Sequence, residues 1–135
     1  MGACISVLLA EDDFNCRDGI ADVLLEEGHR VVSVRNGLEA LAALDWIERP
    51  ALIFLDVYMP LMDGIVFLSH LRGRADRDDF EVVVMSAVLG PDTFVNTPGV
   101  VTALKKPFGV QDMLAAVAEF AARRQGGASA SSSAP

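Results

Sequence analysis

The sequence has few cysteines and no metal-binding motif built on them. Its 135 residues include two cysteines, Cys4 and Cys16, and neither forms a CxxC pair or lies near a histidine at metal-ligand spacing. This argues against a zinc site and against a disulfide framework. We expect Cys16 to be a buried apolar side chain in a reducing, cytoplasmic compartment.

Positive charge and long hydrophobic runs are also scarce. Eleven Lys and Arg residues stand against 19 Asp and Glu residues, a formal net charge of -8. Direct binding to nucleic acid or to an anionic membrane surface requires clustered Lys and Arg, so we expect neither. The longest weakly charged stretch, residues 82–104, is broken by Pro91 and Pro98, which excludes membrane insertion as a helix.

What the chain does contain is a regular alternation of short apolar runs and amphipathic stretches. The strand-like runs are residues 5–10, 30–34, 51–55, 81–85 and 100–104, and the helix-like stretches are residues 15–27, 38–47, 64–71 and 110–124. Continuous apolar strands separated by helices are typical of a parallel sheet covered on both faces. We therefore predict a doubly wound, five-stranded α/β domain over residues 1–124.

Two segments depart from this regular pattern. Residues 89–99 (LGPDTFVNTPG) contain two prolines and few good helix formers, so we predict a weak or shortened fourth helix there. Residues 125–135 (QGGASASSSAP) offer no apolar side chain large enough to anchor them. We predict that they form a disordered tail.

Polar residues follow four of the five predicted strands. They are Glu11, Asp12 and Asp13 after the first strand, Asp56 after the third, Ser86 after the fourth, and Lys105 and Lys106 after the fifth. Because ligands bind at the carboxyl ends of strands in such sheets, we expect these side chains to converge. Two carboxylates 4 Å apart repel by about 4 kcal/mol at an effective dielectric near 20, and a hard divalent cation such as Mg²⁺ compensates this charge.

These groups favour phosphoryl chemistry. A carboxylate beside Mg²⁺, together with a hydroxyl and an ammonium group, forms a site that stabilises a phosphoryl group. Carboxylates also act as nucleophiles that form acyl phosphates. Asp56 is the candidate nucleophile, with Ser86 and a lysine beside it.

Four motifs carry a family resemblance. They are residues 7–13 (VLLAEDD), 56–64 (DVYMPLMDG), 84–87 (VMSA) and 106–108 (KPF). With these motifs, the chain from Ile5 to about Arg124 resembles the receiver domain of bacterial two-component response regulators. The resemblance implies a flavodoxin-like (βα)5 sandwich with strand order 2-1-3-4-5. It also implies a histidine kinase or a histidine phosphotransfer protein as the phosphoryl donor.

The resemblance also assigns roles to the residues at the strand ends. It implies that Asp56 is the phosphoacceptor and that Mg²⁺ is held by Glu11, Asp12, Asp56 and the backbone carbonyl of Tyr58. It also implies that Ser86 binds a phosphoryl oxygen. Lys106, rather than Lys105, would pair with the phosphoryl group. Glu11 replaces the commoner Asp, so we expect its longer side chain to reach the metal through water. We expect Asp13 to stay peripheral. In this family the bond before Pro107 is often cis.

Departures from the family pattern concern the output and the lifetime of the phosphorylated state. Ala103 occupies the position, three before Lys106, where the family usually has an aromatic switch residue. Tyr58 and Val88, each two residues beyond a site residue, either pack in the fold or obstruct the water that hydrolyses an acyl phosphate. In the second case we predict slow self-dephosphorylation.

We therefore predict a signalling phosphoacceptor in Mg²⁺-dependent two-component signal transduction or a phosphorelay. It would assist its own phosphorylation and dephosphorylation, would not be an enzyme in the usual sense, and would act on a downstream protein target without an attached output domain. The alternatives are a receiver excised from a hybrid kinase and a degenerate receiver that acts only in protein interactions. A phosphohydrolase is disfavoured because Tyr58 stands where such enzymes have a second Asp. A dinucleotide-binding domain is disfavoured because GxGxxG is absent after the first strand.

Overall fold

The computed structural model describes residues 4–88, 94 and 96–133 and has five strands in one parallel sheet. The strands are β1 (Ser6–Ala10), β2 (Arg30–Val34), β3 (Ala51–Asp56), β4 (Phe80–Ser86) and β5 (Val100–Lys105), in the order β2-β1-β3-β4-β5. The helices are α1 (Phe14–Glu26), α2 (Gly37–Ala43), α3 (Gly64–Arg72) and α4 (Val110–Ser133), with a short 3₁₀ helix at Arg77–Asp79. The predicted fold class and strand order are confirmed.

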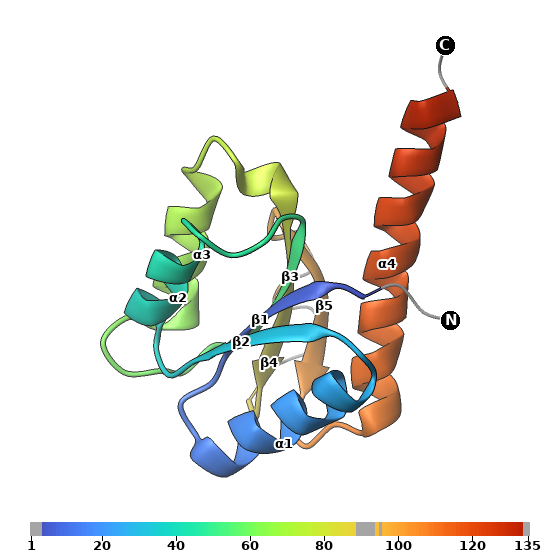
Figure 1. Cartoon of the computed structure of the whole chain (residues 1–135). Coiled ribbons are helices and arrows are strands. Elements are labelled where there is room, and N and C mark those ends of the chain that lie inside the picture. Colours follow the sequence, from blue (N-terminus) through green and yellow to red (C-terminus); the bar gives the residue numbers. More distant parts are fainter. Residues whose placement is uncertain (1–3, 89–93, 95, 134–135) are drawn as a thin grey trace.

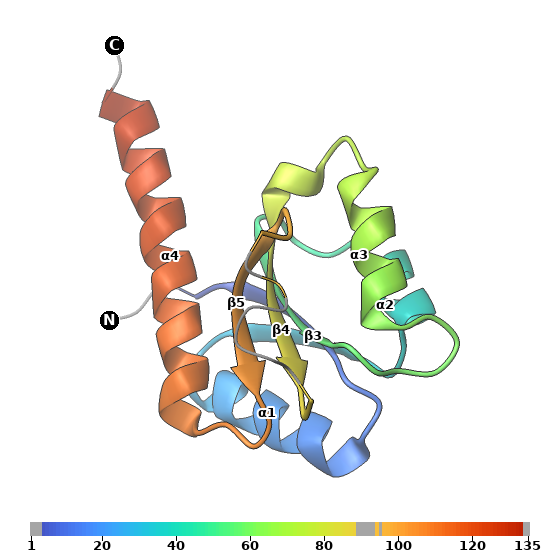
Figure 2. The same ribbon diagram turned by 180° about the vertical axis from the view of Figure 1, so that it is seen from behind.

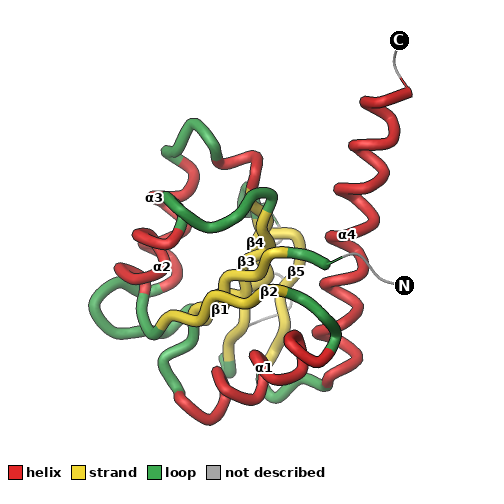
Figure 3. The backbone as a smooth tube through the Cα atoms, viewed as in Figure 1, coloured by secondary structure: helices red, strands yellow, loops and turns green. Residues whose placement is uncertain are grey.

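The sheet is the central layer, and helices cover both of its faces. Helices α1 and α4 lie on one face and α2 and α3 on the other (Figures 1 and 2), with the strands between them (Figure 3). Val7 and Leu9 of β1 share a buried cluster with Phe120 of α4, whereas Leu8 shares a second cluster with Phe67 of α3. Successive side chains of a strand point to opposite faces, which is why these strands are apolar throughout.

The strand register brings the carboxyl ends to one edge of the sheet. Ala10 of β1 pairs with Leu55 of β3, Asp56 pairs with Met85 of β4, and Ser86 pairs with Lys105 of β5. The residues that directly follow these positions therefore lie at the same level. This edge carries the candidate site.

Helix α2 is shorter than its pattern predicts. It ends at Ala43, and the side chain of Arg49 donates hydrogen bonds to the carbonyls of Leu44 at 2.6 Å and Ile47 at 3.2 Å. Carbonyls at a helix end need such donors, so Arg49 stabilises a turn in place of a further helical turn. As a result Trp46, which the predicted helix over residues 38–47 would include, lies beyond the helix and is 64% exposed.

The end of the chain also differs from the predicted boundaries. Helix α4 continues past Arg124, where we predicted its end, to Ser133. No proline interrupts this segment, although its two glycines and four serines have lower helix propensity than its alanines. The domain boundary at residue 124 and the disorder of the tail stay predictions. The predicted weak fourth helix falls mainly on residues 89–93 and 95, which lie outside the described residues. Phe94, which the structure does describe, is buried against the face of the sheet that α2 and α3 cover.

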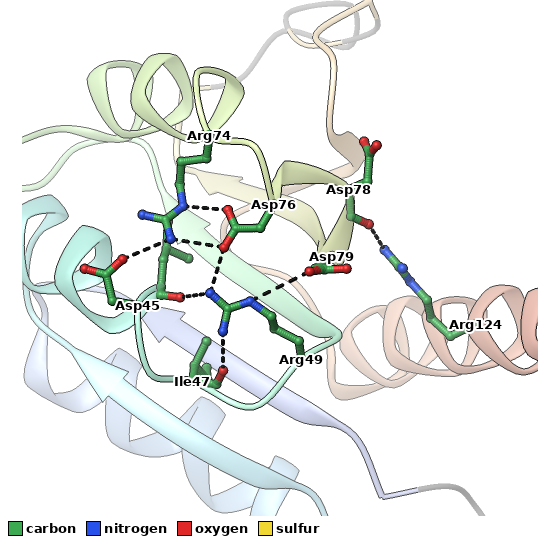
Figure 4. A network of polar contacts seen from close by, with 9 residues as sticks. Asp45, Ile47, Arg49, Arg74, Asp76, Asp78, Asp79 and Arg124 are labelled. Carbon is green, nitrogen blue, oxygen red and sulfur yellow. Dashed lines mark hydrogen bonds and ion pairs between the residues drawn. The ribbon is translucent and has the colours of Figure 1, made fainter.

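A network of ion pairs ties together the loops before β3 and β4, at the amino ends of the strands (Figure 4). Arg74 bonds Asp45 at 3.0 Å and Asp76 at 2.8 Å, and Arg49 bonds Asp76 at 2.7 Å and approaches Asp79 to 3.8 Å. Asp76 therefore joins two guanidinium groups. This network stabilises the end of the sheet opposite the candidate site.

Within the part of the chain that the structure describes, none of the helices combines the length and apolar character needed to span a membrane.

Candidate functional site

Three carboxylates and one ammonium group converge at the carboxyl edge of the sheet. Glu11, Asp12 and Asp56 each offer a carboxylate oxygen, and these oxygens lie within 4.8 Å of one another. Lys106 forms an ion pair with Glu11, and its Nζ lies 3.4 Å from Oδ2 of Asp56. The structure thus places these four sequence-predicted residues in one cluster.

Glu11 is the most enclosed member of the cluster. Its side chain is 1% exposed; Oε1 is paired with Lys106, and Oε2 accepts a hydrogen bond from the backbone N–H of Asp13 at 3.1 Å. The side chain of Asp13 accepts from the N–H of Cys16 at 2.7 Å and caps the amino end of α1. This capping role keeps Asp13 out of the cluster, as expected from the sequence.

The electrostatic environment differs sharply between the two buried carboxylates. Burial, with a further contribution from the neighbouring Glu11, raises the pKa of Asp56 to about 7, although Lys106 opposes the shift. Burial also acts to raise the pKa of Glu11, but hydrogen bonds, first of all from Lys106, outweigh it and lower that pKa. Burial and the adjacent Glu11 carboxylate therefore disfavour the ionised form of Asp56.

These donors fit a hard divalent cation. All three acidic residues offer oxygen ligands, and one ammonium group does not balance three carboxylates. Mg²⁺ prefers such oxygen ligands and commonly binds through one or two carboxylates together with water and phosphate oxygens. The cluster therefore has the chemical character of a magnesium site.

The backbone around Asp56 is tightly packed. Oδ1 of Asp56 accepts a hydrogen bond from the N–H of Tyr58 at 3.3 Å, and the N–H of Gly64 donates to the carbonyl of Val57 at 2.7 Å. A Cβ atom at Gly64 would lie 2.8 Å from the Asp56 carbonyl oxygen, which leaves no room for a side chain. Asp63 caps α3 through the N–H of Val66. The Asp-Gly pair thus starts α3 directly against the strand end.

Ser86 and Lys106 are joined through the backbone. Ser86 is buried at the end of β4, where its hydroxyl accepts from the N–H of Val88 at 3.1 Å. The N–H of Lys106 donates to the Ser86 carbonyl at 2.9 Å, and the Lys106–Pro107 peptide bond is cis. Lys105 is exposed on β5, so Lys106 is the lysine that reaches the acidic cluster.

Two further positions show features that the sequence left open. Tyr58 is 63% exposed and Val88 is 68% exposed, which argues against the reading that they simply pack in the fold. The Mg²⁺-binding role of the Tyr58 carbonyl stays a prediction. Ala103 is exposed on β5 and pairs with Val84.

Sequence reasoning missed Arg17, whose side chain donates hydrogen bonds to the loop that carries Glu11 and Asp12. An isolated arginine on a helix gives no signal of such a contact.

The fold and this acidic edge define a signal receiver of the doubly wound α/β class. The family model for the response regulator receiver domain matches residues 7–118, and the chain belongs to this family. Receiver domains of this family interact with histidine kinases or phosphotransfer proteins and generally bind Mg²⁺ at an acidic pocket.

Individual relatives agree with this assignment. The chain is 29% identical over 116 residues to sporulation initiation phosphotransferase F of Bacillus subtilis (strain 168), covering 84% of this chain and 91% of that protein. It is 32% identical over 113 residues to the transcriptional regulatory protein PdtaR of Mycobacterium tuberculosis (strain H37Rv), covering 82% of this chain but 54% of that protein. The solved receiver domain of a signal transduction histidine kinase from Syntrophus aciditrophicus superposes with a TM-score of 0.71 at 30% identity, covering 82% and 85% of the two chains.

Proposed function

We propose that this receiver domain accepts a phosphoryl group on Asp56 from a phosphohistidine of a histidine kinase or a histidine phosphotransfer protein, in the presence of Mg²⁺. The observation that supports this most is the cluster itself. Asp56 is a nearly buried carboxylate within 4.8 Å of the Glu11 and Asp12 oxygens and 3.4 Å from an ammonium group. Such a carboxylate is an activated nucleophile beside groups that stabilise a phosphoryl group.

The transfer step follows from the chemistry of the two partners. An oxygen of the ionised Asp56 carboxylate attacks phosphorus, an O–P bond forms, and the P–N bond of the phosphohistidine breaks. The electron pair of that bond stays on the ring nitrogen. A phosphohistidine protonated on its other ring nitrogen therefore leaves as neutral imidazole, and an unprotonated one leaves as imidazolate, which takes up a proton from water. Lys106 lies beside Oδ2 and would pair with the phosphoryl oxygens, and the Ser86 hydroxyl would donate to one of them.

The acidic residues would hold the metal. Asp12 and Asp56 offer carboxylate oxygens directly, Glu11 would act through water because Lys106 and Asp13 engage its oxygens, and the Tyr58 carbonyl would complete the protein ligands. When bound, Mg²⁺ offsets the negative charge of the transferring phosphoryl group.

The proposal extends to the downstream step. The signal would pass to a partner protein or, by onward phosphoryl transfer, to a second histidine, in a cytoplasmic pathway. Similarity to a relative named as a phosphotransferase, of which the chain covers 91%, supports onward transfer.

The test is phosphorylation by a small-molecule donor. The protein is incubated with acetyl phosphate and Mg²⁺ and measured by intact mass, alongside Asp56→Asn and the control Asp22→Asn, which alters an exposed aspartate of α1. We expect one phosphoryl adduct on the wild type and on the control, and none on Asp56→Asn. The wild type should also gain no adduct when EDTA is present during the incubation. A wild type that gains no mass while a known receiver does would refute the proposal and favour the degenerate receiver.

A further inference from the structure

Arg17 connects helix α1 to the acidic loop between β1 and α1. It lies one turn beyond the capping residue Asp13, and its Nη1 atom is 2.8 Å from the Glu11 carbonyl oxygen and 3.3 Å from the Asp12 carbonyl oxygen. Among the residues that the structure describes, no other group donates a hydrogen bond to either carbonyl. One guanidinium nitrogen thus holds the backbone of two neighbouring acidic residues.

Asp12 depends on this backbone for its position. Its side chain is exposed, and within the described part of the chain no donor bonds its carboxylate. Glu11, in contrast, is held at both side-chain oxygens by Lys106 and by the N–H of Asp13. The conformation of the loop therefore decides whether the Asp12 carboxylate lies beside Asp56.

The guanidinium is itself oriented by its surroundings. It lies over the ring of Phe14, 5.6 Å from the ring centroid and one helical turn before Arg17. A cation over an aromatic face is favourable, and it reduces the conformational freedom of the arginine. Arg17 also brings positive charge to the acidic loop without occupying a carboxylate oxygen that a metal needs.

We propose that Arg17 is a positioning residue for the magnesium site. By bonding the carbonyls of Glu11 and Asp12, it fixes the loop so that the Asp12 carboxylate is ready to bind Mg²⁺ together with Asp56. Arg17 touches neither the metal nor the phosphoryl group. This inference rests on the proposed function only in that the cluster binds Mg²⁺.

The first test measures Mg²⁺ affinity by isothermal titration calorimetry on the full chain. Arg17→Ala removes both hydrogen bonds, Arg17→Gln keeps part of the aliphatic stem, and Arg35→Ala removes an arginine that follows β2 and pairs with Glu39 on the surface. Loss of an outer residue that orients metal ligands typically weakens metal binding by about 10- to 100-fold. We expect a loss in this range for both Arg17 variants and less than a twofold change for Arg35→Ala.

The second test needs no metal. The Glu11 amide donates to the Val34 carbonyl and the Asp13 amide to the Glu11 carboxylate. Hydrogen exchange of these two amides, measured by NMR in EDTA, should be faster in the Arg17 variants than in the wild type and unchanged in Arg35→Ala. The inference would be overturned if a folded Arg17→Gln protein had the Mg²⁺ affinity and the amide exchange rates of the wild type. It would also be overturned if Arg35→Ala lost as much Mg²⁺ affinity as the Arg17 variants, because that result would indicate a charge effect alone. If the wild type itself binds no Mg²⁺, the proposed function fails, and the exchange rates still decide whether Arg17 fixes the loop.

Discussion

Asp56→Asn should stabilise the metal-free protein, and the gain should depend on pH. The pKa of Asp56 rises from 3.8 to about 7 on folding, mainly because the carboxyl is buried, with Glu11 adding to the effect. Between these two values the folded state binds more protons than the unfolded state. The free energy of unfolding therefore falls as the pH rises through this range, and the substitution abolishes this loss.

The structure sets the size of the effect. One pKa unit corresponds to about 1.4 kcal/mol, so a shift of this size amounts to about 4 kcal/mol at full ionisation. This shift already includes the opposing attraction between Asp56 and Lys106, 3.4 Å apart. We expect Asp56→Asn to be more stable than the wild type by about 2 to 4 kcal/mol at pH 8 and by about 0 to 1 kcal/mol at pH 4.

The assay is urea unfolding in EDTA, followed by far-UV circular dichroism from pH 4 to pH 8. Asp22→Asn is the matched control, because it removes an exposed carboxylate of α1, and it should show no pH-dependent gain. Saturating Mg²⁺ should narrow the gap, since the wild type binds the metal and the variant lacks one proposed ligand. A gap that is absent at pH 8, or that is the same at every pH, would refute the reasoning.

Three further perturbations test other parts of the molecule. Asp76→Asn should lower the free energy of unfolding by about 1 kcal/mol at pH 7. Hydrogen bonds from Arg74 and then Arg49 lower the pKa of Asp76, so the difference from the wild type should shrink as the pH falls below about 4. Urea titrations at pH 7 and below about pH 4 would measure this difference. Gly64→Ala should cost about 1 to 3 kcal/mol and slow acetyl phosphate labelling, because its Cβ would lie 2.8 Å from a backbone oxygen. Gly73→Ala, whose nearest neighbour is 3.5 Å away, should cost less in the same assays. Tyr58→Ala and Val88→Ala should shorten the lifetime of the phosphorylated protein, measured as loss of the adduct mass with time, because both exposed side chains stand beside the site; unchanged lifetimes would rule out shielding of the acyl phosphate.

The sheet was predictable because its signal is strong and local. Uninterrupted apolar runs such as residues 51–55 are required wherever a strand is buried on both faces, and the sequence alone places Asp56 at the end of one. The length of α2 was not predictable, because its end depends on Arg49, which reaches the helix from the loop before β3. Trp46 was misplaced for the same reason.

The candidate site shows the same division. Its carboxylates and lysine follow strand ends, so topology alone brings Glu11, Asp56 and Lys106 together. The contacts that orient them are tertiary: Arg17 reaches back to a loop, and the bond between Lys106 and Glu11 joins opposite ends of the sequence. Periodicity and motif spacing carry no information on such bonds.

The register between β1 and β3 has a consequence for folding. Ala10 faces Leu55, so a slip of one residue would turn Asp56 toward the opposite face of the sheet from the one it occupies now. A misaligned sheet would then lack the oxygen cluster altogether. Under the proposed function, Mg²⁺ would bind only chains with the native strand register. The cation would then stabilise this register over a shifted one, in addition to its part in signalling.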